Sequence, residues 1–101
     1  MLIDVFEKPE RYRFSIVGRQ INERYGTAIA GKFADEIEAR NPIEYLRSQG
    51  SATVERGAPT YFQCISDADA ETRGSHSYVR MLFPMWGEGH IGMLMGAISW
   101  I

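Results

Sequence analysis

The C-terminal part of the chain, from Thr60 to Ile101, contains three stretches with the composition of β-strands. They cover Thr60 to Ser66, Ser77 to Met85 and Ile91 to Ile101, and polar or glycine-containing segments separate them. Strands that follow one another through such turns pair as antiparallel hairpins. This feature constrains the fold most, because it predicts a three-stranded antiparallel sheet to which the rest of the chain must be added.

The N-terminal end of the chain predicts two further strands of the same sheet. Leu2 to Phe6 is mostly apolar, and Glu7 to Glu10 carries the proline and charges typical of a turn. From Arg11 to Val17 apolar and polar side chains alternate with a period of two, which indicates a half-buried strand. We therefore expect an N-terminal hairpin and a sheet of five strands in all.

Helical periodicity replaces the strand pattern after Gly18. Ile21 and Tyr25 lie four residues apart among polar neighbours, which predicts a short amphipathic helix that ends at Gly26. A second helical turn is expected over residues 33–37. These short helices fall between the second and third strands.

The longest helix is predicted to begin at Asn41. Asn41 is a suitable N-cap, Pro42 suits the first turn, and Glu44 stands where it would complete a capping box. Gly57 followed by Pro59 is a stop signal, and Gly50-Ser51 would kink or divide the helix. The predicted fold class is α+β, with a five-stranded antiparallel sheet and short helices on one face, as a single domain over residues 1–101.

Composition excludes several classes of function. The chain has 101 residues with 11 basic and 13 acidic side chains, and a nucleic-acid binder would need a basic surface. A single cysteine excludes a disulfide framework, and the apolar stretch 91–101 is shorter than the ~20 residues of a membrane helix. No basic and apolar leader opens the chain, so we expect a cytoplasmic protein without nucleic-acid or membrane partners.

The order of two strands, short helices and three strands resembles the PAS superfamily of bacterial sensory and interaction modules. Segment 11–18 with the helix after it, segment 54–59 before a strand, and segments 80–84 and 94–97 look like parts of a small bacterial single-domain PAS-like family. The resemblance implies a PAS-like fold and a non-enzymatic sensory or protein-interaction module in signal transduction. Family members carry further residues ahead of the first strand, whereas Met1 directly abuts that strand here. We therefore expect the sheet face that such residues would cover to be either bare or covered by another copy of the chain.

PAS-like modules hold haem, flavin or a small metabolite between sheet and helices. Haem requires an axial histidine on the helical side, whereas His76 and His90 fall beside or within hairpin loops. The light-sensing flavin branch uses an Asn-Cys-Arg type motif on a helix, whereas Cys64 lies on a predicted strand between Gln63 and Ile65. We expect neither cofactor, and we expect Cys64 to be a small buried side chain with a protonated thiol.

No metal site is predicted either. His76 and His90 lie at opposite ends of the strand from Ser77 to Met85. The acidic residues of segment 67–71 resemble the start of a calcium loop, but Thr72 replaces its glycine and Tyr78 its glutamate.

The resemblance implies a ligand pocket between the sheet and the helices, in which Gly96 would leave room. Arg80 would anchor an anionic ligand if it pointed inward, since a buried charge needs a partner. The sequence favours the other orientation, with the arginine stem lying across the outer face. The candidate ligand-binding residues are Ile16, Tyr45, Leu46, Phe62, Cys64, Arg80, Leu94, Gly96 and Ile98.

The last strand is apolar on both faces, which predicts cover on both. Met93, Met95 and Ala97 share the face assigned to the outside, where adaptable methionines suit partner binding. A flanking segment or loop of the same chain is the alternative cover. We favour a homodimer through this face, with Met93, Met95 and Ala97 as its interface.

The sequence thus predicts a sensory or interaction module that dimerises through its sheet, takes a small ligand in the helix-side pocket, and reports to a signalling partner through contacts with another chain. A small α+β enzyme is one alternative, and it requires a carboxylate or histidine buried in an acid–base pocket. A purely structural dimerisation module is the other, favoured if side chains fill the helix-side space.

Overall fold

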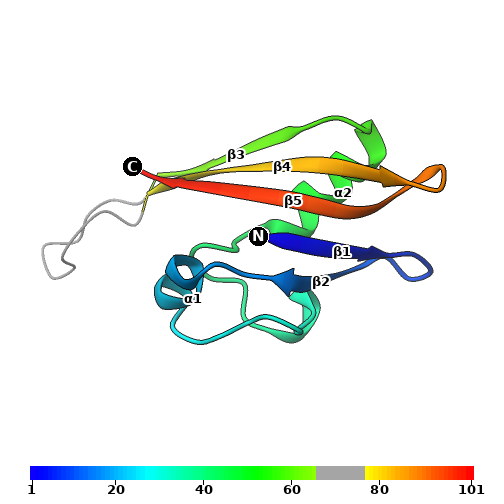
Figure 1. Ribbon diagram of the computed structural model, residues 1–101. Helices are drawn as coiled ribbons and strands as arrows, with labels where there is room; N and C mark the ends of the chain where they lie inside the picture. Colours follow the sequence, from blue (N-terminus) through cyan, green and yellow to red (C-terminus); the bar gives the residue numbers. More distant parts are fainter. Residues whose placement is uncertain (66–76) are drawn as a thin grey trace, which may run out of the picture.

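The computed structural model describes residues 1–65 and 77–101 and has an α+β fold (Figure 1). Two α-helices and one 3-10 helix lie between the second and third strands, as the sequence predicts. The elements in chain order are β1 (Leu2–Phe6), β2 (Arg11–Ile16), α1 (Arg19–Tyr25), η1 (Ala34–Glu36), α2 (Leu46–Arg56), β3 (Thr60–Cys64), β4 (Tyr78–Gly87) and β5 (His90–Trp100).

All five strands form one antiparallel sheet in the order β2-β1-β5-β4-β3. The N-terminal strand β1 therefore lies inside the sheet, beside the C-terminal strand β5 (Figure 1). Ile3 pairs with Leu94 on β5 and with Phe14 on β2, so these side chains point to the same face. The five-stranded antiparallel sheet and the N-terminal hairpin are confirmed.

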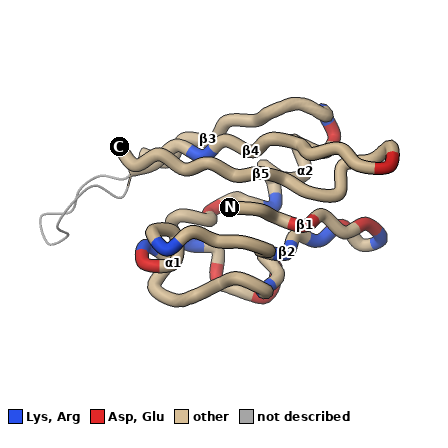
Figure 2. Tube along the Cα trace, viewed as in Figure 1, with Lys and Arg blue, Asp and Glu red and all other residues tan. Residues whose placement is uncertain are grey.

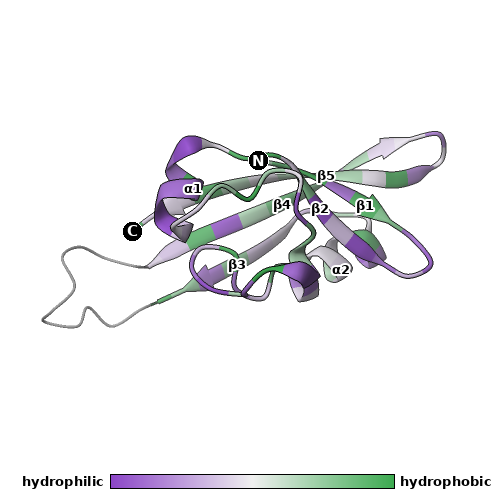
Figure 3. Cartoon of the chain, turned by 90° about the horizontal axis from the view of Figure 1, so that it is seen from below, coloured by the Kyte–Doolittle hydropathy of each residue, from purple (hydrophilic) through white to green (hydrophobic). Residues whose placement is uncertain are grey.

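The hydrophobic core lies between that face and the helical segments. Ile3, Phe14 and Leu94 are fully buried there and belong to one cluster with residues of α1 and α2. In Figure 3 most of α1 is hydrophilic, and only its residues Ile21 and Tyr25 are buried. None of the described helices has the length and apolar composition that crossing a membrane requires.

The predicted start of the long helix is wrong. Helix α2 begins at Leu46, and the residue before it, Tyr45, has a left-handed backbone with φ of 56°. The local capping signals do not start a helix here, and the side chain of Glu44 accepts a hydrogen bond from Tyr78 of the sheet. Residues 41–45 form turns that lead into the helix.

The predicted end of α2 at Gly57 is confirmed, and the helix is continuous through Gly50 and Ser51. Strand β4 runs two residues past the predicted end, through Pro84 to Gly87, with a register shift between Met85 and Trp86. Ser66, the acidic segment 67–71 and His76 lie outside the described residues.

Candidate functional site

Arg80 points from β4 toward the helices and is fully buried, with 0% of its surface exposed. Its Nε donates to Oε1 of Gln49 at 2.7 Å. Its Nη1 donates to the carbonyl of Pro42 at 2.9 Å, and its Nη2 donates to the carbonyl of Glu44 at 2.7 Å. The outward orientation favoured from the sequence is therefore wrong.

Through these hydrogen bonds Arg80 links β4 of the sheet to the turns before α2. The guanidinium also lies 4.7 Å from the ring centroid of Phe62. Burial lowers the pKa of Arg80 to about 10, because desolvation disfavours the charged form, so the side chain stays charged at neutral pH. The three hydrogen bonds that the Arg80 side chain donates among the described residues all go to acceptors of the chain itself, and its role as a ligand anchor stays a prediction.

Glu44, Cys64 and Tyr78 form a polar cluster next to Arg80. The Tyr78 hydroxyl donates to Oε1 of Glu44 at 3.3 Å, and the Cys64 thiol lies 3.9 Å from its Oε2. Burial raises the pKa of the Cys64 thiol, and the charge of Glu44 raises it further, so the thiol is protonated at neutral pH. Burial likewise raises the pKa of Tyr78. The cluster therefore offers hydrogen bonds but no activated nucleophile.

Several predicted pocket residues do come together. The rings of Tyr45 and Phe62 lie 5.8 Å apart, and those of Phe62 and Tyr78 lie 6.1 Å apart. Leu46 is buried beneath them in the core. Ile16 stands apart from this group, at the end of β2, with 59% of its surface exposed.

The room predicted above Gly96 is not empty. A Cβ atom placed at Gly96 would lie 2.8 Å from Cε of Met1 and 3.3 Å from Cδ2 of Leu82. Leu94 on the same strand is fully buried and Ile98 is half-buried, and both belong to or pack against the core. The pocket therefore does not extend over Gly96, because Met1 and Leu82 fill that space.

Two cavities open beside α2 instead. One, of about 400 Å³, lies among residues 34–48 and includes Glu44 in its lining. The other, of about 670 Å³, lies between α2 and β3. Its lining includes the predicted Tyr45 and Phe62, together with helix residues that the sequence analysis did not single out: Ser48, Gln49, Ala52 and Arg56.

The outer face of the sheet carries the predicted interface residues. Met95 is 44% exposed, Ala97 is exposed and Met93 is half-buried, so the outward orientation of this set is confirmed. Met81 and Met85 of β4 are exposed too and point to the same face. Figure 2 shows few charges on β3, β4 and β5, whereas charged residues gather on β1, β2 and the helical segments. We call this outward surface of β4 and β5, formed by Met81, Met85, Met93, Met95 and Ala97, the methionine face.

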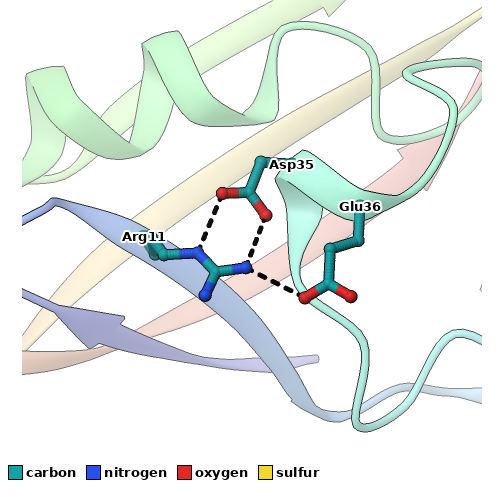
Figure 4. Close-up of polar contacts among 3 residues, drawn as sticks. All are labelled: Arg11, Asp35 and Glu36. Carbon is teal, nitrogen blue, oxygen red and sulfur yellow. Dashed lines mark hydrogen bonds and ion pairs between the residues drawn. The ribbon is translucent and has the colours of Figure 1, made fainter.

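A second polar group ties η1 to β2 (Figure 4). Arg11 donates from Nε and Nη2 to both carboxylate oxygens of Asp35 at 2.9 Å, and its Nη2 also donates to Glu36 at 2.9 Å. The guanidinium lies 3.8 Å from the ring centroid of Phe33. Such a bidentate contact fixes the segment that follows α1 against the strand.

The Arg11 charge holds the pKa of Asp35 below its ordinary value of about 3.9, mainly through the hydrogen bonds between the two side chains. We expect Arg11→Gln to move the titration midpoint of Asp35 upward, as followed by carboxyl carbon NMR. The ionised Asp35 stabilises the fold above its unfolded pKa, and this contribution is lost as the pH falls through the folded pKa. An unchanged midpoint in Arg11→Gln would contradict the pairing.

No group of three or more His, Cys, Asp or Glu that could hold a metal ion occurs within residues 1–65 and 77–101. His90 begins β5 and is exposed, and His76 lies outside the described residues.

Comparison with known protein families, with curated proteins and with solved structures finds no match to this chain.

Proposed function

We propose that the chain is a PAS-like sensory or protein-interaction module of bacterial signalling, without enzymatic activity, that dimerises through the methionine face. Its element order, with the helical segments inserted between β2 and β3, supports the resemblance noted in the sequence. The core between the helices and a single face of the sheet supports it as well. We propose a cytoplasmic location and a signalling-protein partner as part of the same hypothesis.

The observation that carries the dimer is the apolar outer face of β4 and β5. Large apolar side chains gathered on one exposed face mark a contact surface in soluble proteins. Methionines adapt their shape to a partner, and a two-fold axis would bring each methionine face against its own copy. No described segment of the chain covers Met81, Met85 or Met95, since each remains exposed.

We expect Met95→Glu to weaken the dimer at least tenfold, because it would bury an unpaired carboxylate in an apolar contact. The measurement is sedimentation equilibrium of the purified chain across a concentration series. The matched control is Ala28→Glu, which adds the same charge to an exposed residue outside the sheet. A wild-type chain that stays monomeric, or a dimer unchanged by Met95→Glu, would refute this interface.

The sensory part of the proposal rests on the cavities beside α2. A ligand bound in one of these cavities would change how α2 packs on the sheet only to the extent that it binds one packing arrangement of α2 more tightly than another. Native mass spectrometry of the purified chain tests this, and we expect a small molecule to be retained. A chain with no retained molecule favours the purely structural dimerisation module.

A small acid–base enzyme is the second candidate, and Glu44 is the observation that favours it. Its carboxylate is half-buried and lines the cavity of about 400 Å³. That carboxylate already accepts a hydrogen bond from Tyr78 and faces a protonated thiol, so its contacts are those of a structural group. We therefore propose the non-enzymatic function first.

A further inference from the structure

The two edge strands of the sheet, β2 and β3, differ in whether another segment of the chain hydrogen-bonds to their outer side. At β2 the chain covers its own edge: the Phe14 amide donates to Lys32 at 2.9 Å, and the Gly31 amide donates to Phe14 at 2.6 Å. Arg11 and Arg13 add charge to that strand. At the opposite edge, β3 has the sequence TYFQC without a charged residue, and no described segment pairs with its outer side. Uncharged and unpaired edges accept further strands readily.

The hydrogen-bond pattern shows which groups of β3 face outward. The Ile101 amide donates to the Ser77 carbonyl at 3.0 Å, so odd-numbered residues of β4 bond to β5. Even-numbered residues of β4 therefore bond to β3, where their register partners are also even-numbered. The backbone N–H and C=O groups of Tyr61 and Gln63 are left facing outward.

The cavity of about 670 Å³ lies along this edge. Thr60, Tyr61 and Phe62 of β3 line it together with residues of α2, so the cavity borders this edge strand on the side of the helix. Its lining combines aromatic and aliphatic residues with the polar Ser48, Gln49 and Thr60, and Tyr45 and Tyr61 are 68% and 59% exposed. An added strand would place alternate side chains against this mixed lining.

The charge of this groove is positive. Arg56, at the C-terminal end of α2, is the one charged side chain among the described residues that line it. Arg56 is exposed and forms no ion pair with any described residue. An arginine without a carboxylate partner, in a groove whose other lining residues are uncharged, complements an acidic group of a ligand.

We propose that the outer edge of β3, together with the groove beside α2, binds an extended peptide segment of another protein that carries alternating apolar and acidic side chains. The peptide adds a sixth strand by hydrogen bonding to Tyr61 and Gln63, and one of its carboxylates pairs with Arg56. Tyr61 is the register partner of Met81, so this surface adjoins the methionine face at β3.

Selection of random ten-residue peptides displayed on phage against the intact chain tests the proposal. We expect the enriched peptides to alternate apolar with acidic residues and to bind saturably by fluorescence anisotropy. Gln63→Pro removes one outward N–H without removing a bond to β4, and we expect it to weaken the best peptide by about tenfold. Gln63→Thr keeps that N–H and is the matched control, and Arg56→Glu is expected to cost at least tenfold as well.

Amide hydrogen exchange of the wild-type chain keeps the test decisive if Gln63→Pro does not fold. Bound peptide should slow exchange at Tyr61 and Gln63, while Phe62 and Cys64, already bonded to β4, should change little. Enrichment of basic peptides, protection elsewhere, or no saturable binder would overturn the proposal. A Gln63→Pro-sensitive dimer of the chain itself would overturn it too, since the occupant would then be a second copy.

Discussion

Replacing Arg80 by methionine is expected to lower the free energy of unfolding by about 3–5 kcal/mol, because it leaves three neutral hydrogen-bond acceptors without their donor and each such loss costs about 1–3 kcal/mol. The acceptors that lose the arginine donor are Oε1 of Gln49 and the carbonyls of Pro42 and Glu44. The substitution also releases the turns before α2 from the sheet. Arg80→Lys should fall between wild type and Arg80→Met, since an ammonium cannot reach acceptors spread around a planar guanidinium.

Urea denaturation followed by circular dichroism measures this effect. Arg19→Met is the matched control, because Arg19 has a side chain 92% exposed and pairs only at the surface with Glu23. We expect that control to change stability by less than about 0.5 kcal/mol. If Arg80→Met were as stable as Arg19→Met, the guanidinium would not stabilise the attachment of the turns before α2 to the sheet.

The strands could be predicted from the sequence because their signal is local. Period-two alternation in Arg11 to Ile16 and turn residues at both ends of each strand act within a few positions of one another. The order of strands in the sheet follows from pairing between β1 and β5, whose paired residues are about ninety positions apart along the chain. No local pattern encodes that contact.

The start of α2 shows how a distant residue overrides local signals. Asn41, Pro42 and Glu44 satisfy the capping rules, yet the carbonyls of Pro42 and Glu44 accept hydrogen bonds from Arg80. Arg80 stands 36 residues beyond Glu44. Its orientation could not be predicted either, because Gln49, its acceptor on α2, comes into place only when the helix packs on the sheet.

The candidate site was predicted in part for the same reason. Tyr45, just before α2, and Phe62, on β3, both line the cavity of about 670 Å³, and their role in ligand binding stays a prediction. Ser48 and Arg56 line that cavity only because α2 lies along β3, which depends on packing. The filling of the space over Gly96 depends on Met1, at the far end of the chain from β5.

Replacing Gly50 by valine is expected to destabilise the chain by about 3 kcal/mol, the upper end of the usual cost of overpacking a core. A Cβ at Gly50 would lie 2.9 Å from Cε1 and 3.0 Å from Cζ of Tyr12. That ring is 4% exposed, and its hydroxyl donates to Glu10, so it has little freedom to move. Gly50 therefore does not break the helix. Because it has no side chain, it lets α2 lie close to Tyr12 of β2.

A smaller loss is expected for Gly50→Ala, because alanine gains about 1 kcal/mol of helix propensity while its Cβ meets the same ring. Ser48→Val is the matched control: it puts the same β-branched residue on an exposed position of α2. Serine and valine have similar helix propensities, so we expect a change of less than about 0.5 kcal/mol. Urea unfolding of Gly50→Val in a Tyr12→Leu background then separates the two causes. If contact with the ring is responsible, Gly50→Val should cost clearly less there, whereas an equal cost in both backgrounds would place the effect in the helix itself.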